Sequence, residues 1–362
     1  MWGGVKNDAG APWERDTPAL SFSTGKPVVA TALHILRDRG LVHYDQPVAR
    51  YWPEFAQNGK GAITVRQALS HSAGLHAVRT MIEHADVLLD WDATVKALEC
   101  ARAAHAPGRY HAYHAVTYGH LIGEIVRRVS GKSVGQFVRE ELAEPLGLRD
   151  FYFGAPPEAI ARTAQIILPR RKDGAGNGNL KLRDSGIKLL ARGLNMVGLP
   201  ASPERVFNSF SAQGIGSWDF SSERVRSACI PAFNGIFGAR DLARFYAALA
   251  NGGTLDGTRV LGSETLREAT QVHTSRPDGI LVMPMRWRLG YHAVFSTRGL
   301  VRGAFGHAGY NGSGAWASPN HQASLALVVN AGVGTPVGDM RLLRLTSVAL
   351  ACQKTYRKQR AA

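Results

Sequence analysis

The sequence predicts an α/β protein of the α+β type, with an antiparallel sheet flanked by helices and a helical insertion. Three observations lead to this prediction: a helix pattern at residues 22–40, helical patterns through the middle of the chain, and four short strand patterns in the last third. Together they favour an α/β domain that is built from both ends of the chain. We expect this domain to comprise residues 1–44 and 231–362, and residues 45–230 to form a helical insertion domain.

The first predicted helix begins close to Ser23. Apolar residues recur at helical spacing from Val29 to Leu36, and Gly40 ends the pattern. A proline is tolerated only in the first turn of a helix, where its missing N–H has no partner to lose. Pro27 therefore places Ser23 at the N-terminal end of this helix.

Three further patterns predict helices in the middle of the chain. Thr64 opens a short helix within residues 63–69, and residues 116–130 are amphipathic. Ser133 and the glutamine three residues later form a capping box for the next helix, and Pro145 is expected to end it. This density of helices is the basis for the predicted insertion domain.

The last third of the chain changes character, because short apolar runs alternate with turn residues. We expect a closing helix at residues 340–354. The predicted strands are residues 287–295, 303–307, 313–318 and 323–330.

Composition excludes several classes of protein. The 362 residues are 45% hydrophobic, which is ordinary for a soluble globular protein, and no run of about 18 apolar residues could span a membrane. The first residues show no signal peptide, so we expect a cytoplasmic protein. The three cysteines, Cys100, Cys229 and Cys352, are far apart, which argues against a disulfide framework or a zinc site.

The chain is basic, with a formal net charge of +15. A nucleic-acid-binding protein usually concentrates its Lys and Arg, whereas here they are scattered, and the densest runs are residues 170–172 and 357–360. We interpret the charge as ordinary surface charge and expect no specific nucleic-acid partner. Weak attraction to acidic polymers or membranes is the alternative interpretation.

A candidate nucleophile lies at the start of the first helix, in the S-x-x-K pattern Ser23-Thr24-Gly25-Lys26. Residues i and i+3 share one helix face, so the Lys26 amine can reach the Ser23 hydroxyl. Serine is a poor nucleophile until a nearby base takes its proton, and burial lets a lysine lose its own proton more easily. The helix N-terminus also favours a developing oxyanion.

Several motifs follow the S-x-x-K pattern in a defined order. They are residues 51–55 (YWPEF), 69–75 (LSHSAGL), 107–108 (PG), 238–242 (GARDL) and 306–309 (GHAG). Together they resemble the β-lactamase-related serine hydrolases called family VIII carboxylesterases, within the serine β-lactamase and penicillin-binding-protein superfamily. The resemblance covers nearly the whole chain. It implies a β-lactamase/transpeptidase-like fold and hydrolysis of small esters through a serine acyl-enzyme, without a cofactor.

The family places a catalytic tyrosine in a Y-x-N motif shortly after Pro-Gly, and Tyr113 stands at that point. A phenol near a protonated lysine is expected to have a lowered pKa, so Tyr113 could pass the serine proton to the leaving alcohol. Tyr110 and Tyr118 are the alternatives for this role. Ala115 replaces the motif asparagine, which puts β-lactam chemistry in doubt.

The third family motif, usually K-T-G, reads His307-Ala308-Gly309 here and is similar to the H-x-G form of esterase relatives. The resemblance implies that Gly309 lets the backbone approach the substrate and that the N–H of Tyr310 joins the N–H of Ser23 in an oxyanion hole. A neutral His307 in place of lysine favours uncharged esters. The alternative is a purely structural histidine.

These interpretations predict an ester hydrolase for short or medium acyl chains. A β-lactamase or D-alanyl-D-alanine carboxypeptidase, an acyltransferase and an inactive binding homologue are the alternatives. We expect no metal, because the cluster around His111 and His114 includes no carboxylate. Relatives usually have extra strands before the element that starts at Trp2, so N-terminal strands are expected to be missing and activity is less certain.

Overall fold

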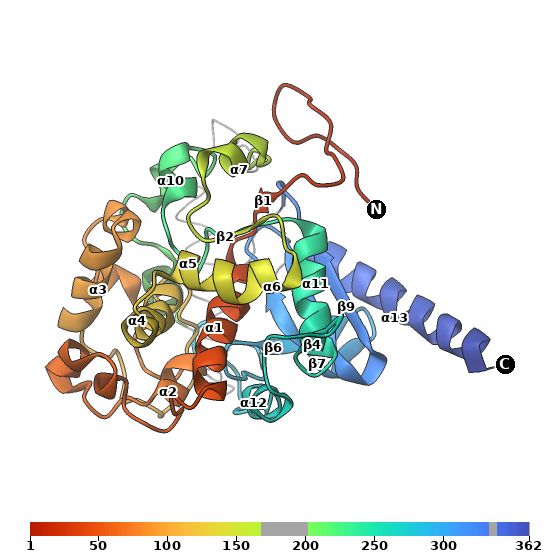
Figure 1. Ribbon diagram of the computed structural model, residues 1–362. Helices are drawn as coiled ribbons and strands as arrows, with labels where there is room; N and C mark the ends of the chain where they lie inside the picture. The colour runs from red at the N-terminus through yellow and green to blue at the C-terminus, as the bar shows by residue number, and fades with distance from the viewer. Residues whose placement is uncertain (168–201, 333–338, 362) are drawn as a thin grey trace.

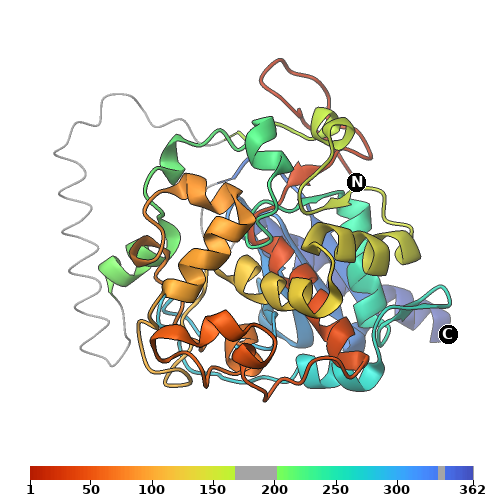
Figure 2. The ribbon, with the colours of Figure 1, turned by 60° about the vertical axis from the view of Figure 1, so that its left-hand side comes forward.

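The computed structural model describes residues 1–167, 202–332 and 339–361 (Figures 1 and 2). The basic run at residues 170–172 therefore lies outside the described residues. The α-helices of the described residues are α1 Lys26–Asp38, α2 Val65–Leu69, α3 Trp91–Cys100, α4 Tyr118–Ser130, α5 Val134–Val138, α6 Glu144–Leu146, α7 Pro157–Arg162, α9 Pro203–Phe210, α10 Glu223–Ser227, α11 Ala239–Ala250, α12 Ser263–Ala269 and α13 Met340–Ala361. The strands are β1 Ala19–Leu20, β2 Phe151–Tyr152, β3 Ile236–Phe237, β4 Thr254–Leu255, β5 Thr258–Arg259, β6 His292–Ser296, β7 Gly299–Ala308, β8 Gly314–Ser318 and β9 Ala323–Leu327.

The principal sheet is antiparallel, as the sequence predicts, and its strand order is β6-β7-β8-β9. Successive side chains of a strand point to opposite faces of the sheet, and helices cover both faces. In β8, Ala315 and Ala317 belong to the main core beside α11, whereas Trp316 donates its indole N–H to Thr346 of α13. In Figure 1, α11 and α13 lie on either side of the strands.

A second, three-stranded sheet joins distant parts of the chain. Its order is β1-β3-β2, and Phe237 of β3 pairs with Ala19 on one side and Phe151 on the other. The start of α1 is thereby fixed against two later segments. The main buried cluster likewise combines side chains of α1, α4, α11 and the principal sheet. The predicted boundaries at residues 44/45 and 230/231 stay a prediction.

Most of the predicted helices are present, with some corrected ends. The helix predicted at residues 22–40 begins as a 3₁₀ turn, Ser23–Gly25. The α-helix α1 starts only after this turn, with Pro27 in its first turn. Thr64 caps α2 in a complete capping box. Pro145 does not end its helix: the chain widens into a π turn at Arg139–Ala143 and α6 then ends before left-handed Gly147.

Several predicted ends in the last third were also wrong: β7 begins at Gly299 rather than at residue 303, and β9 ends at Leu327 rather than at residue 330. Residues 287–291 form a turn rather than the start of a strand, since the Arg288 N–H donates to the Tyr291 carbonyl and Gly290 has a φ of +90°. The closing helix α13 continues beyond residue 354 to Ala361. Among the helices of the described residues, none combines the length and apolar character that crossing a bilayer requires.

Candidate active site

The backbone around Ser23 turns sharply between β1 and α1. Phe22 has φ 50° and ψ −129°, a conformation that non-glycine residues rarely adopt and that costs about 1–3 kcal/mol. Gly25 follows in a confined position, where a Cβ would lie 2.6 Å from the Pro231 carbonyl oxygen. These constraints hold Ser23 at the start of the helix, with 9% of its surface exposed.

Lys26 lies one helical turn after Ser23 and is fully buried. Its Nζ is 3.0 Å from the Ser23 Oγ, and it donates to the carbonyl oxygens of Ala115 at 2.7 Å and Ala232 at 2.8 Å. Burial away from water lowers the pKa of Lys26 well below its usual value. The S-x-x-K spacing therefore brings serine and amine together as the sequence predicts.

Tyr113 completes a three-residue cluster. Its hydroxyl donates to the Ser23 Oγ at 2.9 Å, and its ring lies 4.9 Å from the Lys26 Nζ. Neither alternative tyrosine makes a hydrogen bond to Ser23 among the described residues, and the Tyr118 hydroxyl donates to the Leu69 carbonyl. The expected direction of the Tyr113 pKa was wrong: burial raises it, and the Ser23 hydrogen bond offsets only part of this.

The loop that carries Tyr113 is held by the LSHSAGL motif, residues 69–75. His71, which has a φ of +63°, accepts the Ala112 N–H at its carbonyl and the His114 N–H at its Nδ1. His114 in turn accepts the Leu75 N–H at 3.0 Å. Burial lowers the pKa of His71 well below its usual value, so its ring is a neutral packing element. This motif therefore positions the tyrosine loop.

Asp278 and Trp287 support Tyr113 from the other side, and the sequence analysis missed both. The buried Asp278 carboxylate accepts N–H groups from Tyr113 at 3.3 Å, Ile280 at 2.8 Å and Leu281 at 2.9 Å. It also accepts the Trp287 indole N–H at 2.8 Å. The indole stacks on the Tyr113 ring with centroids 5.4 Å apart and an angle of 11°. Residues 277–279 (PDG) signal only a turn in the sequence.

The third motif lies at the end of β7, next to the nucleophile turn. His307 is buried, its ring centroid is 5.9 Å from that of Tyr113, and its Nδ1 lies 2.8 Å from the Ala308 carbonyl. A nitrogen that faces a carbonyl carries the proton, so Nε2 is an acceptor, and it has no partner in the described structure. Burial lowers the pKa of His307 well below its usual value, so the ring is neutral.

Gly309 brings this strand end against the backbone before Ser23. A Cβ on Gly309 would lie 2.5 Å from the Ser21 carbonyl oxygen, so only glycine permits the approach. Among the described residues, the backbone N–H groups of Ser23 and Tyr310 donate to no protein acceptor. Tyr310 is 40% exposed, and its ring centroid lies 5.7 Å from that of Phe22, so the two rings form an aromatic rim near Ser23.

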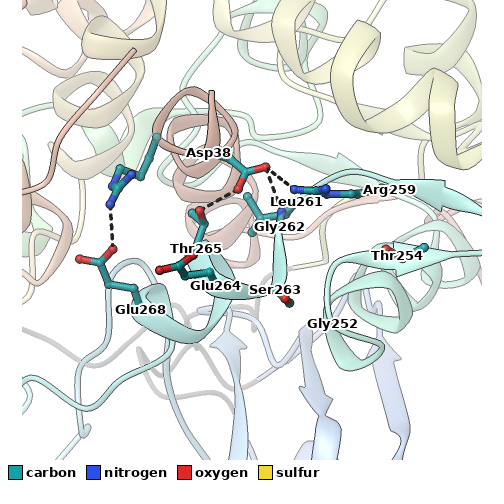
Figure 3. Close-up of a pocket in the computed structure, with 11 residues that line it drawn as sticks. Asp38, Gly252, Thr254, Arg259, Leu261, Gly262, Ser263, Glu264, Thr265 and Glu268 are labelled. Carbon is teal, nitrogen blue, oxygen red and sulfur yellow. Dashed lines mark hydrogen bonds and ion pairs between the residues drawn. The ribbon is translucent and has the colours of Figure 1, made fainter. Parts of the chain in front are cut away.

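A separate cleft of about 480 Å³ lies between the C-terminal end of α1 and the start of α12 (Figure 3). The carboxylate of Asp38, which lines the cleft, accepts hydrogen bonds from the Gly262 N–H at 3.0 Å, the Thr265 hydroxyl at 2.8 Å and the Arg259 side chain at 3.3 Å. These bonds tie α12 to α1, and the cleft contains none of the predicted site residues. We therefore assign it a structural role.

Known proteins resemble the chain over most of its length. The protein-family model described as Beta-lactamase matches residues 1–350. The esterase/beta-lactamase LipL of Mycobacterium tuberculosis is 38% identical over 336 residues, which cover 91% of this chain and 73% of that protein.

Two solved structures have the same fold. A family VIII carboxylesterase superposes with a TM-score of 0.81 at 32% identity, covering 97% of this chain and 88% of the other. A penicillin-binding-protein homologue from Caulobacter crescentus gives 0.79 at 33% identity, covering 96% and 88%. The predicted β-lactamase/transpeptidase-like fold is therefore confirmed. The order of the motifs, the cluster around Ser23 and these likenesses all agree. The chain therefore belongs to the Beta-lactamase family, and it resembles the family VIII carboxylesterases within it.

Proposed function

We propose that the protein is a carboxylesterase (EC 3.1.1) that hydrolyses small esters through an acyl-enzyme on Ser23. The observation that carries this proposal is the pair of contacts at the Ser23 Oγ, 3.0 Å from the Lys26 amine and 2.9 Å from the Tyr113 hydroxyl. A serine activated by a base and completed by a proton donor is the requirement for acyl transfer. The names of the relatives, esterase/beta-lactamase and family VIII carboxylesterase, support the same reaction.

Lys26 is the proposed base for the first proton. Two carbonyls, those of Ala115 and Ala232, accept two N–H bonds from its amine. A neutral amine has two hydrogens and one lone pair, so the lone pair is left for the Ser23 hydroxyl proton. The lowered pKa of Lys26, caused by burial, makes this neutral form accessible.

Tyr113 is the proposed proton donor to the leaving alcohol. Its raised pKa keeps the phenol protonated, and its hydroxyl already points at the Ser23 Oγ. Ser23 bonds to the ester carbonyl carbon as its proton moves to Lys26. The carbon–oxygen bond to the alcohol then breaks, Tyr113 gives that oxygen its proton, and Lys26 restores the proton to Tyr113. Water attacks the acyl-enzyme by the same transfers in reverse order and releases the acid.

The developing oxyanion has two proposed donors, the N–H groups of Ser23 and Tyr310. Both are free of protein acceptors among the described residues, so neither must break a bond to receive the oxyanion. Gly309 supports this role, because it lets the strand end approach Ser21. Each such donor is worth about 2.7–4 kcal/mol of barrier.

Uncharged esters with short or medium acyl groups are the proposed substrates. Phe22 and Tyr310 form an aromatic rim, and Phe210 packs 5.9 Å from Tyr113. A neutral His307 offers no cation for a carboxylate, such as those of β-lactams and D-alanyl peptides. The name of LipL, esterase/beta-lactamase, nevertheless includes β-lactamase, so slow β-lactam hydrolysis is the second candidate activity. Cytoplasmic location stays a prediction.

The test is covalent labelling by a fluorophosphonate probe, with the adduct located by mass spectrometry. We expect an adduct on Ser23, none in Ser23→Ala, and undiminished labelling in the matched control Ser21→Ala, whose buried hydroxyl donates only to the Ala19 carbonyl. Hydrolysis of p-nitrophenyl acetate, butyrate and octanoate then ranks acyl length, and nitrocefin tests the second activity. A folded protein that gives no adduct would overturn the proposal in favour of an inactive binding homologue. An added alcohol that outcompetes water would favour an acyltransferase.

A further inference from the structure

A second concave surface, distinct from the active site, lies between the β6–β7 hairpin and α13. This groove has a volume of about 730 Å³. Its apolar floor is formed by Val301 of β7 together with Leu350 and Ala351 of α13, and Leu300 of β7 lines the rim, because neighbouring side chains of a strand point to opposite faces. Val301 and Leu350 belong to the small hydrophobic cluster between the principal sheet and α13. Leu300, at the hairpin end, is 41% exposed, so apolar surface continues from the groove into solvent.

The walls of the groove carry four cations and no acid. Arg298 and Arg302 come from the hairpin side, and Lys354 and Arg357 come from α13. Among the described residues, Arg357 donates only to uncharged oxygens, the Asn320 carbonyl at 3.3 Å and the Gln322 side chain at 3.0 Å. The other three cations form no ion pair within the described part of the chain.

The surrounding sequence has the same charge bias. From Gly279 to the end of the chain, ten Lys or Arg residues stand against a single carboxylate, Asp339. Asp339 is itself paired with Arg341, so it does not neutralise the groove. The middle of the chain differs, because arginines such as Arg66, Arg128 and Arg162 are paired with carboxylates. Ten cations and one carboxylate give this stretch +9 of the formal net charge of +15, and four of the ten cations line the groove.

We propose that this groove is a docking surface for a membrane that contains anionic phospholipids. Such a surface offers both features that the groove complements: negative headgroups for the four cations, and acyl chains for Leu300 and the floor. A nucleic acid would satisfy the cations but would leave the aliphatic floor without a partner, since single strands are bound by stacking on aromatic rings. The proposed binding is peripheral and reversible, with the groove between the hairpin end and α13 facing the headgroups.

The experiment is co-sedimentation of the full chain with vesicles of phosphatidylcholine alone or mixed with phosphatidylglycerol. We expect binding only to the mixed vesicles, weakening as salt is raised. Each cation near an anionic surface contributes about a fivefold increase in partitioning, so Arg298→Gln combined with Lys354→Gln is expected to lower the partition coefficient roughly 25-fold. Leu300→Asn is expected to weaken binding at every salt concentration, because it removes the exposed apolar group.

The matched control is Arg102→Gln combined with Arg109→Gln, which removes the same charge from two exposed arginines outside the groove. If this control loses as much binding as the groove variant, the effect is one of net charge and the proposal fails. Equal binding to uncharged vesicles also overturns it, as does retention on DNA at physiological salt without vesicle binding. Unchanged hydrolysis of a soluble ester shows that each variant is folded, and it separates this result from the proposed function.

Discussion

Replacing Asp278 by asparagine tests how the structure holds Tyr113. The carboxylate accepts four N–H groups, and three of them reach the same oxygen, Oδ1. The asparagine oxygen can keep these three bonds, but its NH₂ group then faces the Trp287 indole N–H, which now bonds to Oδ2. Losing a hydrogen bond to a charged group costs about 1.5–3 kcal/mol. Burial raises the pKa of Asp278 and so opposes its charge. An uncharged amide avoids the cost of burying that charge, so we expect the free energy of unfolding to fall by only about 1.5 kcal/mol, the lower end of this range.

Activity is expected to fall more than this loss of stability implies. A displaced indole no longer stacks on the Tyr113 ring, and the tyrosine hydroxyl leaves its 2.9 Å contact with Ser23. General acid–base catalysis contributes roughly 10²–10⁴-fold, so a partial misplacement is expected to lower kcat by about 10–100-fold, with KM little changed. The alkaline limb of the kcat profile is also expected to move to lower pH, because the Asp278 charge helps to raise the Tyr113 pKa.

The assays are urea unfolding and the pH dependence of p-nitrophenyl butyrate hydrolysis. Trp287→Phe is the companion variant, since it keeps an aromatic ring beside Tyr113 but removes the indole donor and part of the buried ring volume. We expect it to lose stability but to retain more activity than Asp278→Asn. A stable Asp278→Asn enzyme with normal kcat would refute the reasoning. A destabilised enzyme with normal kcat and an unchanged pH profile would reduce Asp278 to a purely structural role.

Three further predictions concern other parts of the site and the core. Tyr113→Phe removes the proposed proton donor but no packing, so kcat is expected to fall about 10²–10⁴-fold while the thermal midpoint is kept; an unchanged kcat would contradict the assignment. Gly309→Ala places a Cβ 2.5 Å from the Ser21 carbonyl oxygen and displaces the Tyr310 N–H, so kcat is expected to fall about 10²–10³-fold. Gly216→Ala, which meets nothing within 4 Å, is its neutral control. Burial lowers the pKa of His34 and His292 to about 4 and that of His120 to about 3. These groups stay neutral in the fold but gain protons when unfolded below about pH 6.5, so stability is full above that pH and is lost as pH falls toward 4. Urea unfolding at about pH 5 is expected to show a loss of up to about 2 kcal/mol per histidine relative to pH 7; equal stability would count against it.

The parts of the site that could be predicted depend on local spacing or on ordered motifs. Ser23 and Lys26 are three residues apart, so helix geometry alone brings them together. Tyr113 could be placed because it follows Pro-Gly in the family order. The antiparallel sheet was predictable for a similar reason, since its strands are consecutive in the chain.

The parts that could not be predicted depend on distant contacts. Asp278 lies 165 residues from Tyr113 in the sequence, and nothing in residues 277–279 distinguishes it from a surface turn. The direction of the Tyr113 pKa was wrong for a related reason: proximity to Lys26 can be inferred from motifs, but the extent of burial follows only from the packing around both groups. The turn at residues 287–291 has apolar residues like a strand, and only Gly290 marks the difference.

The two carbonyls that hold Lys26 come from segments 89 and 206 residues away. Reactivity at Ser23 is therefore a property of the finished fold. In a nascent or partly unfolded chain, Lys26 is hydrated and protonated like any surface lysine, and the serine beside it is inert. The cell is thereby spared an acylating nucleophile on incomplete chains, which an inhibitor or a stray ester could otherwise trap. The same dependence makes covalent labelling of Ser23 a direct reporter of complete folding in any variant of this protein.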